Sequence, residues 1–374
     1  MQFTIKKSQF LNALNIASHG IGSKVSIPAL MCFKIEVKDN NICITSSNGT
    51  ITILTKVPFT MNDQTYVRDA VPGAILLNAR ILLDMVRKLE GEEVSITIVD
   101  EVNAKIEDGK SLYNLNCIDA EEYPDIILDE GMNPLTIKAI DLIRLTEQTA
   151  FAADKNFDKI LQAINLKVES QKLVATATNT AIMSRKTLSL DEDVVGFSVN
   201  VPANTLLEVC KLLEGVSEVR FSALQRKCIF VFGNTLLSSS LVDGPYPNLP
   251  SRLFTQQHKT VLEVSASQIL STIDRVSLLA SDHDSRIKLS MNPDRVKISC
   301  VSEQIGSCSE DLPAFQLNGD PLDIFINAIY LTQAIKAVGS EDVQICFNDF
   351  NTPFTIKNPK DDSIIEVLTP LRTR

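Results

Sequence analysis

The stretch that decides the fold occurs twice, as Ala79-Arg-Ile-Leu-Leu-Asp-Met-Val-Arg-Lys-Leu-Glu-Gly91 and as Ala203-Asn-Thr-Leu-Leu-Glu-Val-Cys-Lys-Leu-Leu-Glu-Gly215. Both copies follow the pattern A-x-x-L-L-[D/E]-x-x-[R/K]-x-L-E-G, and they are offset by 124 residues. A weaker third copy begins at Ala328, a further 125 residues along the chain. Each copy runs into a segment in which apolar and polar residues alternate. Self-similarity at a fixed period indicates a repeated architecture, so the chain predicts three similar units.

Each copy has the periodicity of an amphipathic helix. In the first copy, Leu82, Met85, Val86 and Leu89 fall at i, i+3, i+4 and i+7, which places them on one face. A second helical pattern precedes each copy, over residues 10–21, 142–153 and 269–280. We therefore expect an α+β fold of three units, each with two helices and about eight short strands in antiparallel sheets.

The repeat length also indicates how the chain divides into domains. A period of about 120 residues is too long for a solenoid, whose repeats have about 20–50 residues, and it is long enough for a separate core. Turn-rich, weakly periodic segments at residues 128–134 and 250–259 are candidate linkers. The expected domains are therefore residues 1–127, 128–253 and 254–374.

The composition is that of an ordinary globular chain. Of its 374 residues 44% are hydrophobic and 22% charged, and no apolar run approaches the ~20 residues of a membrane span. Residues 1–10 alternate like a strand and do not resemble a signal peptide, so we expect a cytoplasmic protein. The eight cysteines form no C-x-x-C pair and have no histidine at metal-ligand spacing. We expect reduced, buried thiols and no metal or cofactor.

The sequence argues against an enzyme. The three histidines, His19, His258 and His283, have no nucleophile motif around them. The chain also lacks a P-loop, a G-x-S-x-G motif and a metal-binding box.

Charge is distributed unevenly between the helices and the rest of the chain. The formal net charge is −10. The six expected helical segments, counted over residues 6–20, 78–89, 138–153, 202–215, 265–281 and 327–339, nevertheless carry 10 basic and 6 acidic residues, against 26 and 40 elsewhere. Solvated helix faces alone would explain this difference. However, a basic residue recurs at the same outer position of the three copies, as Arg87, Lys211 and Lys336. This recurrence favours a local basic surface on an acidic protein.

Several motifs, taken in order, resemble the bacterial DNA polymerase III beta subunit, the beta sliding clamp. They are the repeat itself, residues 23–30 and 274–280, the two corners Glu122-Tyr-Pro-Asp125 and Pro245-Tyr-Pro-Asn248, and the C-terminal Leu368-Thr-Pro-Leu-Arg372. The resemblance covers the whole chain. It implies the DNA clamp fold and a ring-shaped homodimer in which helices line the hole. It also implies that the protein encircles duplex DNA and tethers the replicative polymerase without catalysing a reaction.

The same resemblance implies partners and site residues. The implied partners are double-stranded DNA bound without sequence preference, the DNA polymerase III alpha subunit, the clamp loader and other proteins with a clamp-binding motif. The residues expected to face DNA are Lys24, Arg80, Arg87, Lys155, Lys159, Lys211, Arg275 and Lys336. A partner-peptide groove is expected to be lined by Leu161, Thr178, Thr180, Met183, Pro247, Arg252, Leu253, Val367, Leu368, Pro370, Leu371 and Arg372. At the dimer interface, Tyr113 and Leu115 on an edge strand are expected to face Leu278 and Leu279 at a helix end.

The chain departs from the family pattern near the expected groove. It has Thr178-Asn-Thr-Ala-Ile-Met183 where the family has Thr-Asp-Gly-His-Arg-Leu, and Asp158-Lys159 where the family has Arg-Pro. One residue is also inserted before Arg252. These departures leave open which partner motif is preferred and whether this is a main or an accessory clamp. The alternative function is a specialised or second-copy clamp-fold scaffold with altered partner specificity.

Overall fold

The structure, a computed structural model, describes residues 1–22, 27–100, 102–126, 128–131, 133–156, 158–192, 194–247, 258–280 and 285–372. Its residues form two compact units. The first unit contains residues 1–140 and 208–241, and the second contains residues 141–207 and 242–374. Two helices, α3 (Ala139–Thr149) and α4 (Ala203–Leu212), have residues in both units.

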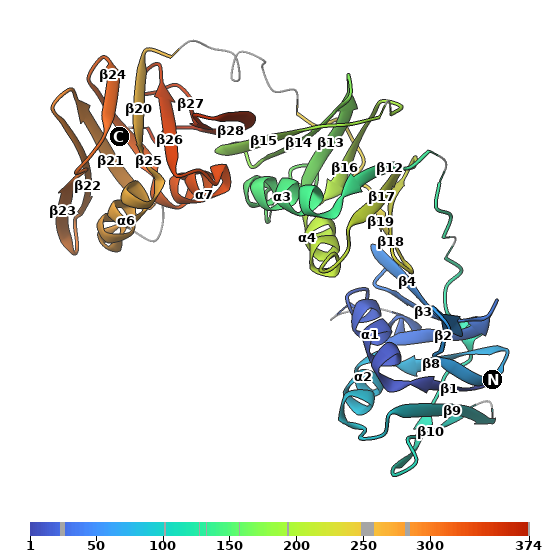
Figure 1. Cartoon of the computed structure of the whole chain (residues 1–374). Coiled ribbons are helices and arrows are strands. Elements are labelled where there is room, and N and C mark those ends of the chain that lie inside the picture. The colour runs from blue at the N-terminus through green and yellow to red at the C-terminus, as the bar shows by residue number, and fades with distance from the viewer. Residues whose placement is uncertain are drawn as a thin grey trace. The chain divides into compact units, whose positions relative to one another are not determined.

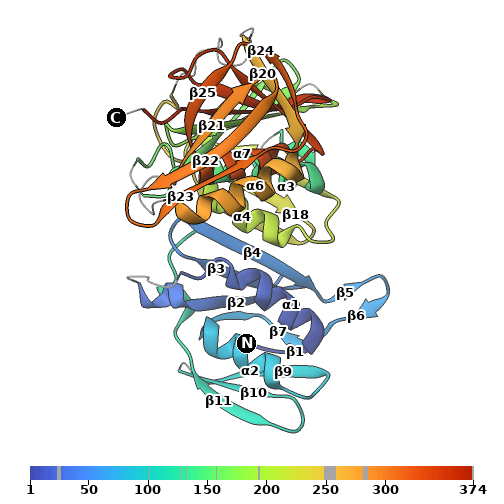
Figure 2. The same cartoon turned by 90° about the vertical axis from the view of Figure 1, so that its left-hand side faces the viewer.

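The first unit is built from two antiparallel sheets and helices α1 (Lys7–Ser18) and α2 (Ala79–Lys88). The smaller sheet has the order β11-β10-β9-β1-β7, with bounds Leu112–Asn116, Asn103–Glu107, Glu93–Asp100, Gln2–Lys6 and Val67–Val71. The larger has the order β12-β17-β18-β19-β4-β3-β2-β8, with bounds Leu135–Lys138, Glu218–Ala223, Lys227–Phe232, Thr235–Ser240, Ile51–Pro58, Asn41–Ser47, Cys32–Lys38 and Gly73–Asn78. Short elements are η1 (Pro28–Met31), η2 (Ala120–Glu122) and the β5–β6 ribbon (Thr60–Met61, Gln64–Thr65), which extends from the end of β4 (Figure 2).

The second unit repeats this plan. Helices α6 (Ala266–Val276) and α7 (Ala328–Val338) lie side by side against its strands (Figure 1). One sheet has the order β16-β13-β14-β15-β28-β27-β26-β20-β24, with bounds Phe197–Pro202, Ala163–Glu169, Lys172–Thr178, Ile182–Ser189, Asp361–Leu368, Phe354–Asn358, Asp342–Phe347, Thr260–Ser265 and Gln316–Gly319. The other has the order β23-β22-β21-β25, with bounds Gly306–Asp311, Arg295–Ser302, Arg286–Asn292 and Leu322–Asn327. Single 3-10 turns are η3 (Ala150–Ala152) and η4 (Ser277–Leu279).

The helices form close to where the sequence predicts them, although α1, α3 and α6 each begin three residues before the expected segment. In α2, Leu82, Met85 and Val86 are buried, and Leu89 directly after the helix is also buried. The side chain of Asn78 caps this helix by accepting a hydrogen bond from the Ile81 N–H at 3.0 Å. Because buried leucines of this kind fill close-packed space, truncating Leu82 to alanine would cost about 2–5 kcal/mol. The predicted α+β class is confirmed.

The repeats are joined by strand pairing. Strand β19 of the middle repeat pairs with β4 of the first, with Leu237 opposite Ile53, and both side chains are fully buried. Strand β15 of the middle repeat pairs with β28 of the third, with Met183 opposite Val367. Each of the two larger sheets therefore continues from one repeat into the next, which is why three repeats form two compact units.

Candidate functional site

The cations expected to face DNA lie at exposed positions wherever the structure describes them. Five of them are on helices: Arg80 and Arg87 on α2, Lys211 on α4, Arg275 on α6 and Lys336 on α7. The other two, Lys155 and Lys159, lie in the segment after η3. The apolar stripe of each helix faces its sheet, so the charged stripe faces solvent. Lys24 lies outside the described residues.

Two of these cations already have a carboxylate partner in the first unit. Arg87 Nη1 is 3.5 Å from Asp84 Oδ1, and Lys211 Nζ is 2.7 Å from Glu208 Oε1. His19 Nδ1 is 2.7 Å from the other oxygen of Glu208. Burial acts to raise the pKa of Glu208, but the hydrogen bonds from His19 and Lys211 outweigh it and lower that pKa below its usual range. The charged carboxylate thus offsets part of the positive charge near it.

A third pair, in the second unit, is bidentate. The Arg275 guanidinium binds Glu310 through Nε, at 2.9 Å, and through Nη2. The hydrogen bond from Arg275 lowers the pKa of Glu310, so the carboxylate stays ionised. Four of the expected cations have no carboxylate within 4.0 Å in the described part of the chain: Arg80, Lys155, Lys159 and Lys336.

A cavity of about 440 Å³ lies in the second unit, where the expected peptide groove was assigned. Six of the expected groove residues line it: Leu161, Thr178, Thr180, Met183, Pro247 and Val367. Its lining also includes Asp158, Ala181, Ile182, Pro353 and Thr369. Most of the surface is apolar, which suits apolar side chains of a bound segment.

The turn between β14 and β15 shapes one wall of this cavity. The Asn179 side chain accepts hydrogen bonds from the N–H groups of Ala181, at 3.1 Å, and Ile182, at 3.0 Å. The Thr178 hydroxyl accepts from the Thr180 N–H at 3.1 Å and donates to the Ile182 carbonyl at 2.8 Å. Thr180 has a φ of 75°, and a left-handed conformation costs a β-branched residue about 1–3 kcal/mol. The segment that departs from the family pattern therefore forms a tightly bonded turn.

The C-terminal residues contribute less to the cavity than expected. Leu368, Pro370, Leu371 and Arg372 do not line it, and Arg252 and Leu253 lie outside the described residues. Successive side chains of a strand point to opposite faces, so Val367 and Thr369 face the cavity while Leu368 is buried in the core.

Strand alternation would have identified Thr369 from the sequence. Pro353 carries no such signal, since it lies in the loop between β26 and β27 and reaches the cavity only through the tertiary fold.

The expected dimer residues lie on, or next to, the outer strand of a sheet. Tyr113, 40% exposed, and Leu115, half-buried, belong to β11, the outer strand of the smaller sheet in the first unit. In the second unit, Leu278 is 78% exposed and Leu279 half-buried. Both belong to η4, which lies beside β22 and the outer strand β23.

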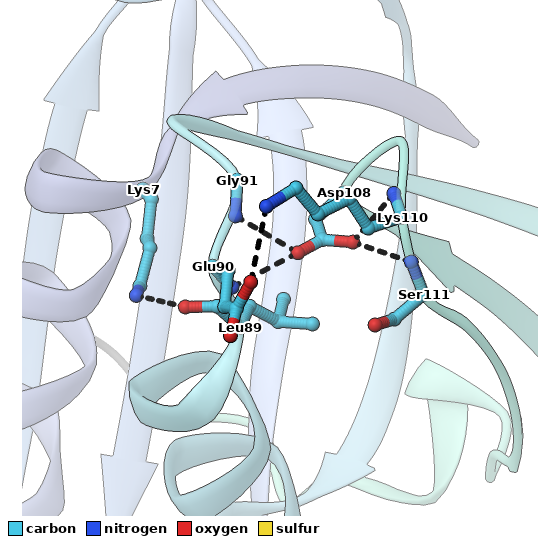
Figure 3. Close-up of polar contacts among 7 residues, drawn as sticks. All are labelled: Lys7, Leu89, Glu90, Gly91, Asp108, Lys110 and Ser111. Atoms are coloured by element: carbon cyan, nitrogen blue, oxygen red, sulfur yellow. Dashed lines mark hydrogen bonds and ion pairs between the residues drawn. The ribbon is translucent and has the colours of Figure 1, made fainter.

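One carboxylate fixes the turn that leads into β11. Asp108 Oδ2 accepts hydrogen bonds from the N–H groups of Gly91, at 2.9 Å, and Glu90, at 3.1 Å, while Oδ1 accepts from Ser111, at 2.7 Å, and Lys110, at 3.1 Å (Figure 3). These backbone bonds, that of Gly91 foremost, lower the pKa of Asp108 to about 2. Gly91 permits the approach, because a Cβ there would lie 2.4 Å from the Asp108 carbonyl oxygen. The β10–β11 turn is thus held against the loop after α2.

The described residues hold no cluster of three or more side chains able to bind a metal ion. Six cysteines are buried and two, Cys210 and Cys308, are half-buried. Burial raises the pKa of the Cys228 thiol to about 12, so it is protonated at neutral pH. Within the described chain no helix has the length and apolar character needed to cross a membrane.

Comparison with known proteins connects these surfaces to one family. Family models of the DNA polymerase III beta subunit match the chain in order: the N-terminal domain over residues 1–127, the central domain over 136–248 and the C-terminal domain over 251–372. The chain is similar to the beta sliding clamp of Bacillus subtilis (strain 168), at 32% identity over 379 residues with 100% of both chains covered.

Solved structures agree. The crystal structure of the DNA polymerase sliding clamp from Bacillus subtilis has a TM-score of 0.96 at 31% identity. That of the DNA polymerase III beta chain from Streptococcus pneumoniae has a TM-score of 0.94 at 28% identity. Each alignment covers 100% of both chains.

Proposed function

The chain belongs to the DNA polymerase III beta subunit family, the bacterial beta sliding clamps, and we propose that its surfaces serve that family's function as follows. It is a DNA sliding clamp, a non-catalytic factor that encircles duplex DNA and confers processivity on the replicative polymerase. The observation that carries this conclusion is the end-to-end similarity to a beta sliding clamp, at 32% identity with both chains fully covered.

In this proposal, two chains close into a ring of six repeats. The repeats correspond to domains 1–127, 128–253 and 254–374 of each chain. Homo-oligomers usually have closed symmetry, and the edge strand β11 with Tyr113 and Leu115 would meet η4 with Leu278 and Leu279 of the partner. The position of β11 at a sheet edge, that of η4 beside the outer strand β23, and the high exposure of Leu278 support this pairing.

The helices would present their cations to the phosphate backbone. Contacts of this kind are independent of sequence and weaken as salt rises. The carboxylates beside Arg87, Lys211 and Arg275 reduce the net attraction. A weakly attractive lining would let the protein slide, because retention on DNA would come from topology and needs no tight binding.

The apolar cavity of the second unit would bind short linear motifs of partner proteins. Its lining by Leu161, Met183 and Val367 suits apolar anchors. The proposed partners are the DNA polymerase III alpha subunit, the clamp loader and other proteins with a clamp-binding motif. As these act on the bacterial chromosome, the proposed location is the cytoplasm.

The test is whether retention depends on the topology of DNA. The protein is loaded by a bacterial clamp loader onto nicked circular DNA and passed through a gel-filtration column, before and after a single cut linearises the DNA. We expect it to elute with the circular DNA and to be lost from the linear DNA. A clamp from Bacillus subtilis loaded in parallel shows that the loader is active. Equal retention on linear DNA, or none on either form, would overturn the proposal, and the second outcome would favour a DNA-free scaffold.

A further inference from the structure

Asp158 is the one ionisable residue among the described residues that line the cavity of the second unit. The remaining lining consists of aliphatic side chains, prolines and threonines. The Thr178 hydroxyl is already committed to the β14–β15 turn. A carboxylate at the margin of such a surface is the main feature that could distinguish one apolar segment from another.

The main chain around Asp158 fixes its position. The Asp158 N–H donates to Asp154 Oδ2 at 3.3 Å, and the Asp158 carbonyl accepts from the N–H groups of Leu161, at 3.0 Å, and Gln162, at 3.1 Å. Its Oδ1 accepts from the Ile160 N–H at 3.0 Å. These bonds restrain the turn and hold the carboxylate through Oδ1, while Oδ2 accepts no hydrogen bond within the described residues. The carboxylate is therefore preorganised for a ligand.

Asp158 has no neutralising partner in the described part of the chain. No Lys, Arg or His nitrogen lies within 4.0 Å of it, and the residue is exposed. The nearby Lys155 and Lys159 are exposed and do not line the cavity. A segment that fills the cavity would cover this carboxylate and remove water from it, which is unfavourable unless a cation replaces the water.

We propose that Asp158 is a specificity residue that selects partner segments carrying a lysine or arginine next to their apolar anchors and disfavours those carrying an acidic residue there. This inference rests on the proposed function of the cavity as a peptide groove. A basic side chain gains a partially desolvated ion pair with Asp158, whereas an acidic one is repelled. The chain would therefore prefer basic over acidic versions of one motif by about tenfold.

The experiment compares two peptide sets by calorimetric titration into the full chain. Both sets share Leu and Phe anchors and differ only in carrying Arg or Glu at one scanned position. We expect an Arg peptide to bind about tenfold more tightly than its Glu counterpart at one position, and the ratio to fall as salt rises. The variant Asp158→Asn keeps an amide oxygen that can still accept the hydrogen bond from the Ile160 N–H. In this variant, the ratio of Arg-peptide to Glu-peptide affinity should fall to about twofold or less.

The control variant is Asp243→Asn. Asp243 is an exposed residue of the same unit that accepts a hydrogen bond from the Gly244 N–H and does not line the cavity. It should keep the tenfold ratio. If Arg and Glu peptides bind equally, or if Asp158→Asn leaves the ratio unchanged, the inference about Asp158 is wrong and the groove stands. If neither set binds, the groove itself is wrong and the inference falls with it.

Discussion

At the scale of single residues, a buried carboxyl lies directly beside the cavity. Glu366 in β28 is fully buried, one position before the cavity-lining Val367, and it points to the opposite face of the strand. Its Oε1 accepts a hydrogen bond from the Ser184 hydroxyl at 2.9 Å, and its Oε2 has no partner in the described part of the chain. Burial raises the pKa of Glu366 well above its usual range, so the neutral acid is the form that suits the fold.

Replacing Glu366 by glutamine should therefore stabilise the protein at high pH. Because the folded-state pKa lies above the unfolded-state value near 4.5, the native chain is most stable below about pH 4.5 with respect to this group and loses stability as the pH rises toward the folded-state pKa. Glu366→Gln has no proton to lose, so we expect its free energy of unfolding at pH 8 to exceed that of the native chain by on the order of 1 kcal/mol.

Urea unfolding between pH 4 and pH 9 measures this difference, and Glu303→Gln, at an exposed position, is the control. If the difference in free energy of unfolding between Glu366→Gln and the native chain does not grow with pH, Glu366 is not held neutral.

At the scale of elements, the cations on the helices fall into two classes, those with a carboxylate partner and those without one. Arg87 on α2 and Lys211 on α4 each have a carboxylate one helical turn earlier. Arg80 on α2 and Lys336 on α7 have no such partner in the described residues. Since a paired cation must give up part of its interaction with a carboxylate to bind a phosphate, the unpaired ones should dominate DNA binding.

We therefore expect Arg80→Gln combined with Lys336→Gln to reduce the salt dependence of DNA binding more than Arg87→Gln combined with Lys211→Gln. Each phosphate contact contributes about 0.9 to the slope of log affinity against log salt. The first double variant should lower the slope by about 2 per chain, and the second by less than about 1. Fluorescence anisotropy with duplex DNA at several salt concentrations gives both slopes. Equal slopes for the two variants would rule out a role for the ion pairs.

At the scale of the whole molecule, the proposed self-association would depend on residues that the fold leaves exposed. Leu278 is 78% exposed on η4, where an aspartate is tolerated in the monomer but would be buried without a partner in the proposed dimer interface. Leu278→Asp should shift the mass in solution at micromolar concentration from two chains to one. Sedimentation velocity measures the mass, and Phe350→Asp, at another exposed apolar position, should remain dimeric. A monomeric native chain would contradict the dimer, whereas a dimeric Leu278→Asp would contradict only the interface.

The sequence by itself determined the class of fold, the three repeats and the helices. These features depend on short, regular spacings between apolar residues, such as the three and four residues that separate Leu82 from Met85 and Val86. Such local spacings can be recognised in a single sequence. The same spacing identified the exposed cations Arg87 and Lys336, because the charged stripe of a helix lies opposite its buried stripe.

The tertiary structure alone decided how the repeats join and which residues beyond the expected groove set line the cavity. The pairing of β19 with β4 and of β15 with β28 links residues about 180 positions apart, and no local pattern encodes such a register. Pro353 reaches the cavity for the same reason, since it comes from a loop that only strand pairing brings there. Leu368 was expected in the groove but is buried in the core, because the pleat of β28 directs Val367 and Thr369 to the cavity and Leu368 to the opposite face.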